Sequence, residues 1–474
     1  MQYAMGEIPY YVYEFFKKGI EDGNNYYSLS QTRSRSAAFF ANATYSYKGR
    51  YTVNGTARYE GTNRMGKSRS ARWLPTWNVS GAWNAHEEKF FSNLTSVLSH
   101  FTLKASYSLT ADRGPADVTN SQAIITSYSP YRPFTSIQES GLYIKELENS
   151  ELTYEKKHEL NIGADMGFLN NRINLAVDWY KRNNYDLIGI VNTQGAGGQI
   201  LKYANIASMK SHGIEFTLST KNIKTKDFNW NTDFIFSNAK NEVTDLKQNA
   251  NVMELISGNG FAKQGYPVRG LFSIPFVGLD KDGIPVIINE KGEATSTDIN
   301  FQERQNTGFL KYEGPTDPTI TGSLGNMFSY KGFRLNLFIT YAFGNVIRLN
   351  PVFKAYYSDL TAMTREFKNR WTLPGDEAKT NVPAILSKRM YDSNEDLKYA
   401  YNAYNYSTER IAKGDFIRLK EISLAYDFPK AWINPLKLTD LSLKVQATNL
   451  FLIYADDKLN GQDPEFFNAG GVAS

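Results

Sequence analysis

Apolar and polar residues alternate along much of this chain, and residues 172–182 show the pattern most clearly. On an extended chain, one face of this segment carries Ile173, Leu175, Val177 and Trp179, and the other carries Asn174, Ala176, Asp178 and Tyr180. A period of two residues is typical of a β-strand with one apolar and one wet face. The segment therefore predicts a two-faced strand.

The same pattern predicts about a dozen strands along the chain. They cover residues 36–47, 50–61, 72–84, 100–110, 154–166, 172–182, 206–220, 227–238, 318–330, 333–343, 416–428 and 441–452. The chain is therefore expected to be all-β.

The connections between these strands are alternately short and long. The long ones include residues 111–152, 183–203, 239–314 and 344–413, and the short ones include residues 48–50, 167–171, 221–226, 331–332 and 429–439. Soluble β-sandwiches and propellers also alternate polar and apolar residues, but nothing gathers their long loops at one end. Outer-membrane barrels have short periplasmic turns and long extracellular loops. The alternation therefore favours a transmembrane antiparallel β-barrel.

Composition agrees with that interpretation. The mean hydropathy is −0.46, and no apolar run approaches the length of a transmembrane helix. A barrel needs no such run, because half of each strand faces water. The net charge is only +5, with acidic and basic residues well mixed, so we expect no nucleic-acid partner. The absence of cysteine excludes disulfides and thiolate metal sites and suits a protein exposed to the periplasm.

Several sequence blocks resemble, in order, the C-terminal half of SusC/RagA-type TonB-dependent transporters from Bacteroidetes outer membranes. The blocks are WNAHEEKFF (residues 83–91), LKASY (103–107), LTYEKKHELNIG (152–163), FLNNRINL (168–175), NIASMKSHGIEF (205–216), FSYKGFRL (328–335), RWTLPGDEA (370–378), DFIRLKEISL (415–424) and ATNLF (447–451). Together they span most of the chain.

This resemblance implies a barrel of roughly 22 strands, an N-terminal plug, a segment that engages TonB, and a SusD-like surface lipoprotein as a lid. It also implies contact with outer-membrane lipid in a Gram-negative bacterium. The chain departs from the family pattern, because no plug, TonB-engaging segment or signal peptide is visible. We therefore expect a fragment without the final strand. Residues 1–35 would be a loop remnant, 36–452 the partial barrel, and 453–474 the start of the last extracellular loop.

No catalytic or metal-binding constellation stands out in the sequence. The four histidines, His86, His100, His158 and His212, are scattered and lack metal-ligand spacing. The DKDG motif at residues 280–283 begins like a calcium loop but lacks the distal glutamate, so we interpret it as a hairpin turn. We expect no cofactor and no enzymatic activity.

Two groups of residues are candidates for contact with a ligand or lid. Aromatic rings beside amides suit sugar faces and protein lids alike, and they occur at Tyr399, Tyr401, Tyr404 and Tyr406, and at Tyr128, Tyr131 and Phe134. Packing between large loops would explain these aromatics equally well. The predicted lumen-facing residues are Asn161, Asp165, Asn174, Asp178, Glu215, Asn231, Asp233 and Asn336. The predicted lipid-facing residues are Leu160, Ile162, Ile173, Leu175, Val177, Ile214, Phe216, Leu335 and Leu337.

These observations favour an outer-membrane importer of oligosaccharides or peptides, energised through TonB, of which this chain forms part of the barrel wall. A soluble all-β carbohydrate-binding or adhesion protein is the alternative, and a β-rich hydrolase is a third hypothesis. The loop composition does not distinguish a glycan substrate from a peptide.

Overall fold

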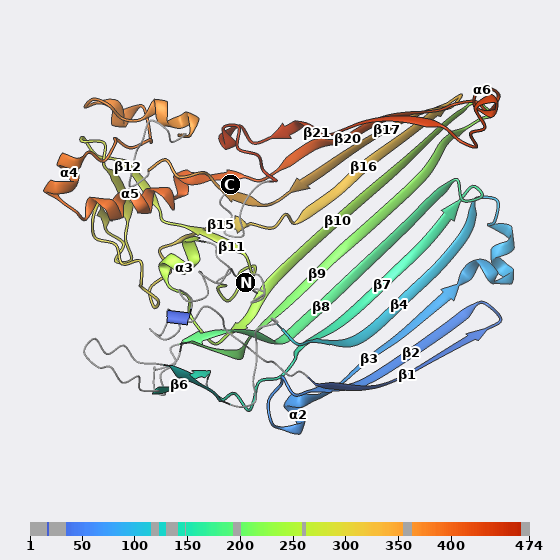
Figure 1. Cartoon of the computed structure of the whole chain (residues 1–474), viewed down its shortest axis with the longest axis horizontal. Coiled ribbons are helices and arrows are strands. Elements are labelled where there is room, and N and C mark those ends of the chain that lie inside the picture. The colour runs from blue at the N-terminus through green and yellow to red at the C-terminus, as the bar shows by residue number, and fades with distance from the viewer. Residues whose placement is uncertain are drawn as a thin grey trace.

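A single antiparallel sheet of twelve strands dominates the computed structural model, which describes residues 17–18, 35–114, 123–128, 141–146, 148–192, 201–257, 262–353 and 363–465 (Figure 1). In spatial order its strands are β1 (Ser36–Tyr47), β2 (Tyr51–Thr62), β3 (Trp73–Asn84), β4 (Leu98–Asp112), β7 (Glu155–Phe168), β8 (Ile173–Asn192), β9 (Leu201–Lys224), β10 (Phe228–Leu246), β16 (Ile320–Tyr330), β17 (Phe333–Phe343), β20 (Phe416–Asp427) and β21 (Ser442–Ala455). The spatial order follows the chain order. The sheet curves but does not close, since β1 and β21 each pair with one neighbour.

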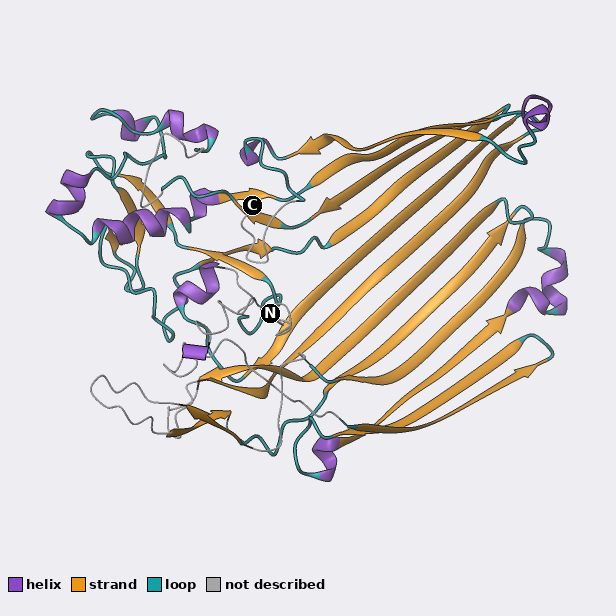
Figure 2. Cartoon of the chain, in the orientation of Figure 1, coloured by secondary structure: helices purple, strands orange, loops and turns teal. Residues whose placement is uncertain are grey.

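The connections separate to the two ends of the sheet, as the alternation of lengths predicts (Figure 2). At the turn end, Lys331 and Gly332 join β16 to β17 with φ angles of 43° and 90°. Positive φ at both residues of a two-residue loop is typical of a type I′ turn, which matches the twist of the strands. The same end carries η2 (Ala85–Glu87), η3 (Lys89–Asn93), α6 (Lys430–Ile433) and η7 (Asn434–Leu436).

Several strands extend beyond their predicted limits. Most of the predicted loop at residues 183–203 is strand, because β8 continues to Asn192 and β9 begins at Leu201. The register shifts between Asn184 and Leu187, and Asp186 has a φ of 56°. This bulge interrupts the two-residue period, and the pairing then resumes. The turn predicted at residues 221–226 is likewise shorter, since β9 runs to Lys224.

The two longest connections form a folded layer at the loop end instead of irregular coil. We call the described residues within 247–319 and 344–415 the loop layer. It contains α3 (Val252–Ser257), β11 (Gly270–Ser273), β12 (Phe276–Leu279), β13 (Pro285–Ile288), β14 (Ala294–Thr295), β15 (Lys311–Pro315), β18 (Val346–Arg348), η4 (Arg365–Asn369), η5 (Asp376–Ala378), α4 (Lys388–Ser393), α5 (Leu397–Asn405), η6 (Thr408–Arg410) and β19 (Ile411–Lys413). Its apolar core joins Val252, Ile256 and Phe272 from the first connection to Ala403 from the second. The loop end also carries α2 (Arg69–Arg72), β5 (Ile124–Tyr128), β6 (Gly141–Glu146) and η8 (Asp457–Leu459).

The strand register gives the sheet one polar and one apolar face. Residues opposite each other on neighbouring strands share a face, and Asp178 lies opposite Glu215, whereas Val177 lies opposite Phe216. The same register places all eight residues predicted to face the lumen on one side, which we call the polar face. The apolar face leaves large side chains uncovered, including Ile162, which is 43% exposed. A broad exposed apolar surface of this kind marks contact with lipid or protein.

The described part of the chain contains no helix long and apolar enough to cross a membrane.

Neighbouring positions on β8 test the two faces. Val177→Arg puts a charge on the apolar face and should cost about 2–4 kcal/mol of folding free energy in a bilayer. Ala176→Arg puts the same charge on the polar face, opposite Asp165, and should cost far less. Folding titrations of the full-length protein in phospholipid vesicles measure both values. Equal costs at the two positions would contradict the assignment of the faces.

Candidate functional site on the polar face

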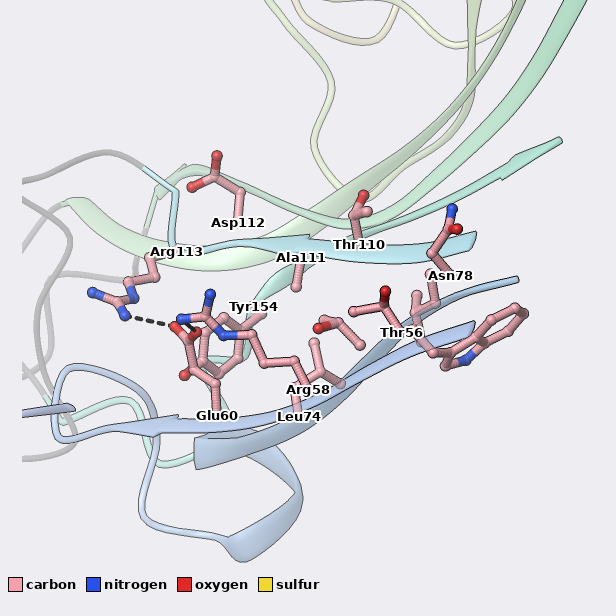
Figure 3. Close-up of a pocket in the computed structure, with 13 residues that line it drawn as sticks. Thr56, Arg58, Glu60, Leu74, Asn78, Thr110, Ala111, Asp112, Arg113 and Tyr154 are labelled. Atoms are coloured by element: carbon pink, nitrogen blue, oxygen red, sulfur yellow. Dashed lines mark hydrogen bonds and ion pairs between the residues drawn. The ribbon is translucent and has the colours of Figure 1, made fainter. Parts of the chain in front are cut away.

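A hollow of about 520 Å³ opens on the polar face where β2, β3 and β4 approach the loop end (Figure 3). Its polar lining comes from Thr56, Arg58, Glu60, Thr76, Asn78, Thr110, Asp112, Arg113 and Tyr154. Polar positions recur every second residue on β2 because the strand alternates. The chain thereby brings Thr56, Arg58 and Glu60 onto one face.

Glu60 is held between two arginines in this hollow. Nη2 of Arg113 donates to one carboxylate oxygen at 2.5 Å, and Arg58 forms an ion pair with the other (Figure 3). The hydrogen bond to Glu60 raises the pKa of Arg113 above its ordinary value, so the guanidinium stays charged. The buried Tyr154 donates its hydroxyl to the carbonyl oxygen of Arg72 at 3.3 Å. The ion pairs with Arg58 and Arg113 thus already engage both carboxylate oxygens of Glu60.

A second hollow of about 300 Å³ lies closer to the turn end of the same strands. It is lined by Thr52, Asn54, Ser80, Gly81, Ala82, Lys104, Ala105, Ser106, Asn161 and Asp178. Two predicted residues, Asn161 and Asp178, meet here. A third, Asp165, pairs with Lys104, whose Nζ lies 2.9 Å from Oδ2.

The other predicted polar residues are spread along the sheet. Asp233 accepts a hydrogen bond of 2.6 Å from Ser219, and the amide of Asn174 donates to the carbonyl oxygen of Asn171 at 3.1 Å. Asn336 lies 3.4 Å from Glu421. These contacts connect neighbouring strands or turns and do not converge on one point.

Sequence reasoning missed Arg58, Glu60 and Arg113. Their alternation on β2 was visible, but the ion pair between Arg113 and Glu60 joins residues 53 positions apart. Only the pairing order of β2, β3 and β4 brings them together.

The structure places Tyr399, Tyr401 and Tyr404 of the predicted cluster on helix α5, where the sequence suggested a loop, and Tyr406 is the C-cap of this helix. Tyr401 and Tyr404 are 1% and 0% exposed, and with Leu397 and Ala400 they form the buried face. That spacing of three and four residues is the apolar stripe of a helix. Tyr406 lies beneath the guanidinium of Arg348. Tyr399 is 38% exposed and keeps a surface that a ligand or lid could reach.

The second aromatic cluster is largely outside the described residues. Tyr128 ends β5, whereas Tyr131 and Phe134 are not among the residues that the structure describes. The binding role predicted for both clusters stays a prediction.

Two buried arginines hold the loop layer together. The guanidinium of Arg348 donates to the carbonyl oxygens of Ile256 and Phe272 at 3.2 and 2.6 Å. Burial lowers its pKa to about 10, so it remains charged at neutral pH. Arg410 donates to both carboxylate oxygens of Glu366, at 2.5 and 3.0 Å. These contacts tie segments that are far apart in the sequence.

Arg410→Met should loosen the loop layer, because it leaves the carboxylate of Glu366 without its partner. Breaking a buried ion pair in this way costs about 3–5 kcal/mol. Hydrogen exchange across residues 363–413 should show lost protection, while the strands stay protected. Arg389→Met removes an exposed arginine of the same layer and is the matched control. Unchanged exchange in Arg410→Met would refute this role.

Among the described residues, no group of three or more His, Asp and Glu side chains is placed to hold a metal ion.

The family model described as "TonB dependent receptor-like, beta-barrel" matches residues 6–450. The chain belongs to this family. The receptor is 25% identical over 446 residues to TonB-dependent receptor P3 of Formosa agariphila, covering 90% of this chain and 41% of that relative. It is 25% identical to TonB-dependent receptor SusC of Bacteroides thetaiotaomicron, covering 95% of this chain and 45% of that protein. The receptor chain thus spans less than half the length of these curated relatives.

A solved structure of the RagAB peptide transporter has the same fold as this receptor. The TM-score is 0.73 at 23% identity, with 94% of this chain and 46% of the other covered. The resemblance to SusC/RagA-type transporters and the antiparallel transmembrane barrel fold are thereby confirmed. Proteins of this family lie in the outer membrane of Gram-negative bacteria, and the matched proteins are named as receptors and transporters, not as enzymes.

Proposed function

We propose that this receptor chain is barrel wall of a TonB-energised nutrient importer in the outer membrane, with an oligosaccharide or a peptide as its substrate. The observation that carries the proposal is the two-faced sheet. Its apolar face is uncovered over the length of the strands, and its polar face carries two hollows. An apolar exterior against lipid and a polar interior are what a water-filled path across a membrane requires.

In this proposal, the predicted polar residues line the lumen and the loop layer covers the entrance. Energy would reach the substrate path through TonB, acting on a region of the full receptor outside this chain. A SusD-like lipoprotein would close the outer entrance. Tyr399 is the member of the tyrosine cluster best exposed for contact with substrate or lid. Buried side chains such as Tyr404 would support that surface from below.

Uptake by whole cells tests the importer function. Cells carrying the full receptor should accumulate a labelled oligosaccharide or peptide from a mixed panel, and deleting the receptor gene should abolish uptake of the same compound. Deleting TonB should abolish it as well. Uptake that persists without TonB would argue against the energised mechanism.

The two ends of the sheet should lie on opposite sides of the membrane, since each strand crosses once. An epitope inserted after Gly292, at a turn of the loop layer with a φ of 81°, should be labelled on intact cells. One inserted after Asn170, in the β7–β8 turn, should be labelled only after permeabilisation. Labelling of the Asn170 epitope on intact cells would reverse the topology. Absence of label at the Gly292 epitope in a well-expressed receptor would also contradict the predicted topology.

A further inference from the structure

Positive charge is concentrated at the turn end of the sheet. The six connections between strands there contain eight Lys and Arg residues and four Asp and Glu residues; they are residues 48–50, 85–97, 169–172, 225–227, 331–332 and 428–441. The two longest connections at the other end, residues 247–319 and 344–415, contain eighteen basic and eighteen acidic residues. The basic excess therefore belongs to the turn end and not to the loop end.

A hollow of about 240 Å³ lies among these basic residues, between the β9–β10 and β16–β17 turns. We call it the rim hollow. Its charged lining consists of Lys226, Asp227, Lys331, Arg334 and Asp427. The backbone N–H of Lys331 donates to the carbonyl oxygen of Asp227 at 3.2 Å, so the two turns are held side by side.

The rim hollow has one positive charge more than its own residues can neutralise. Its three cationic side chains share two carboxylates. Arg334 pairs with Asp427, at 2.7 Å between Nη2 and Oδ1, which leaves Asp227 for two lysines. Within the described part of the chain, neither Lys226 nor Lys331 forms an ion pair, and both lysines are exposed. The hollow can therefore accept a singly charged anion.

Exposed aromatic rings of the apolar face begin at the edge of the rim hollow. Tyr330 and Phe333 also line it, and they are 50% and 49% exposed. They lie opposite each other on β16 and β17, and alternation places them on the same face as Leu335. Nζ of Lys331 lies 5.3 Å from the centroid of the Tyr330 ring, so this side chain extends toward the apolar face. A cation and an uncovered apolar surface thus meet at one point.

The aromatic surface continues along the turn end to helix α6 (Figure 1). Tyr426 lies opposite Phe333, with ring centroids 4.4 Å apart, and Phe428 lies 5.0 Å from Tyr426. Trp432 of α6 lies 6.4 Å from Phe428 and is 62% exposed. Tyrosine and tryptophan at the ends of membrane-spanning segments lie at the level of the lipid head groups. The rim hollow is therefore continuous with the lipid-facing surface of the wall.

This combination matches the chemistry of an anionic phospholipid. The phosphodiester of its head group is negatively charged and accepts strong hydrogen bonds from lysine ammonium groups. Basic residues beside a membrane attract anionic lipids, and basic pockets at the membrane surface bind their head groups. The acyl chains would cover the apolar face. A soluble anion could use the two lysines but would leave Tyr330 and Phe333 uncovered.

We propose that the rim hollow binds the head group of an anionic phospholipid from the periplasmic leaflet. Lys226 and Lys331 hold the phosphate, and the acyl chains lie along Tyr330 and Phe333. The bound lipid links the β9–β10 and β16–β17 turns at the depth of the head groups. This inference goes beyond the importer function and rests on a wall that spans the membrane with its turn end toward the periplasm.

Native mass spectrometry of the purified full receptor in detergent tests this site. The probes are phosphatidylglycerol and phosphatidylcholine with the same acyl chains, and the affinity of the first bound lipid is measured. Phosphatidylglycerol should bind at least about tenfold more tightly, because phosphatidylcholine brings its own cation. The double variant Lys226→Gln with Lys331→Gln should weaken phosphatidylglycerol binding at least about fivefold and leave phosphatidylcholine binding unchanged. Lys226→Arg with Lys331→Arg keeps both charges and should bind within about twofold of the parent receptor.

Lys281→Gln with Lys398→Gln is the matched control, because it removes two lysines from the loop layer. Lys398 lies over the ring of Tyr399 much as Lys331 lies over Tyr330. This control should leave both affinities unchanged. Equal losses in the two glutamine double variants, or equal binding of the two lipids, would overturn the proposal.

Inorganic phosphate separates the lipid from a soluble anion. It lacks acyl chains and should not displace phosphatidylglycerol. Displacement by phosphate would assign the two lysines to a soluble anion and would overturn the lipid site. Uptake does not enter these measurements, so their failure leaves the importer proposal standing.

Discussion

The structure depends on one constraint, that a strand in hydrocarbon must pair every backbone N–H and C=O group with a neighbouring strand. Ten of the twelve strands of the large sheet have a neighbour on both sides, and β1 and β21 have one each. In a bilayer, those two outer edges also need partner strands. Once the backbone is paired, the side chains decide which face meets lipid and which meets water.

The same constraint divides the receptor into two parts with different stabilising interactions. The strands of the wall are held by their ladders of hydrogen bonds and, in a membrane, by lipid on the apolar face. The loop layer cannot use lipid and builds its own core around Val252, Ile256 and Phe272. Arg348 and Arg410 supply polar links across that layer. A substitution in one part should therefore leave the other largely intact.

The sequence predicted the wall well because its signal is local. Alternation alone separated Val177 from Asp178 and gave the short turns their place. It ended this strand at residue 182, just before the bulge around Asp186, where one extra residue on β8 shifts the later side chains to the other face. The loop layer was not predictable in the same way. Arg410 forms an ion pair with Glu366, 44 residues away in the sequence, and no local sequence pattern predicts that contact. Tyr401 and Tyr404 had a helical spacing in the sequence, but their tyrosine-rich composition suggested an exposed loop.

Cysteine scanning along β8 tests the central claim most directly, because this chain contains no cysteine of its own. Single variants from Ile173 to Tyr180 in the full receptor would be probed in native membranes with a water-soluble maleimide and with a lipid-soluble one. The two-faced wall predicts strict alternation: the water-soluble reagent reaches positions 174, 176, 178 and 180, and the lipid-soluble reagent reaches 173, 175, 177 and 179. Equal reaction of both sets with the water-soluble reagent would contradict a membrane-spanning wall.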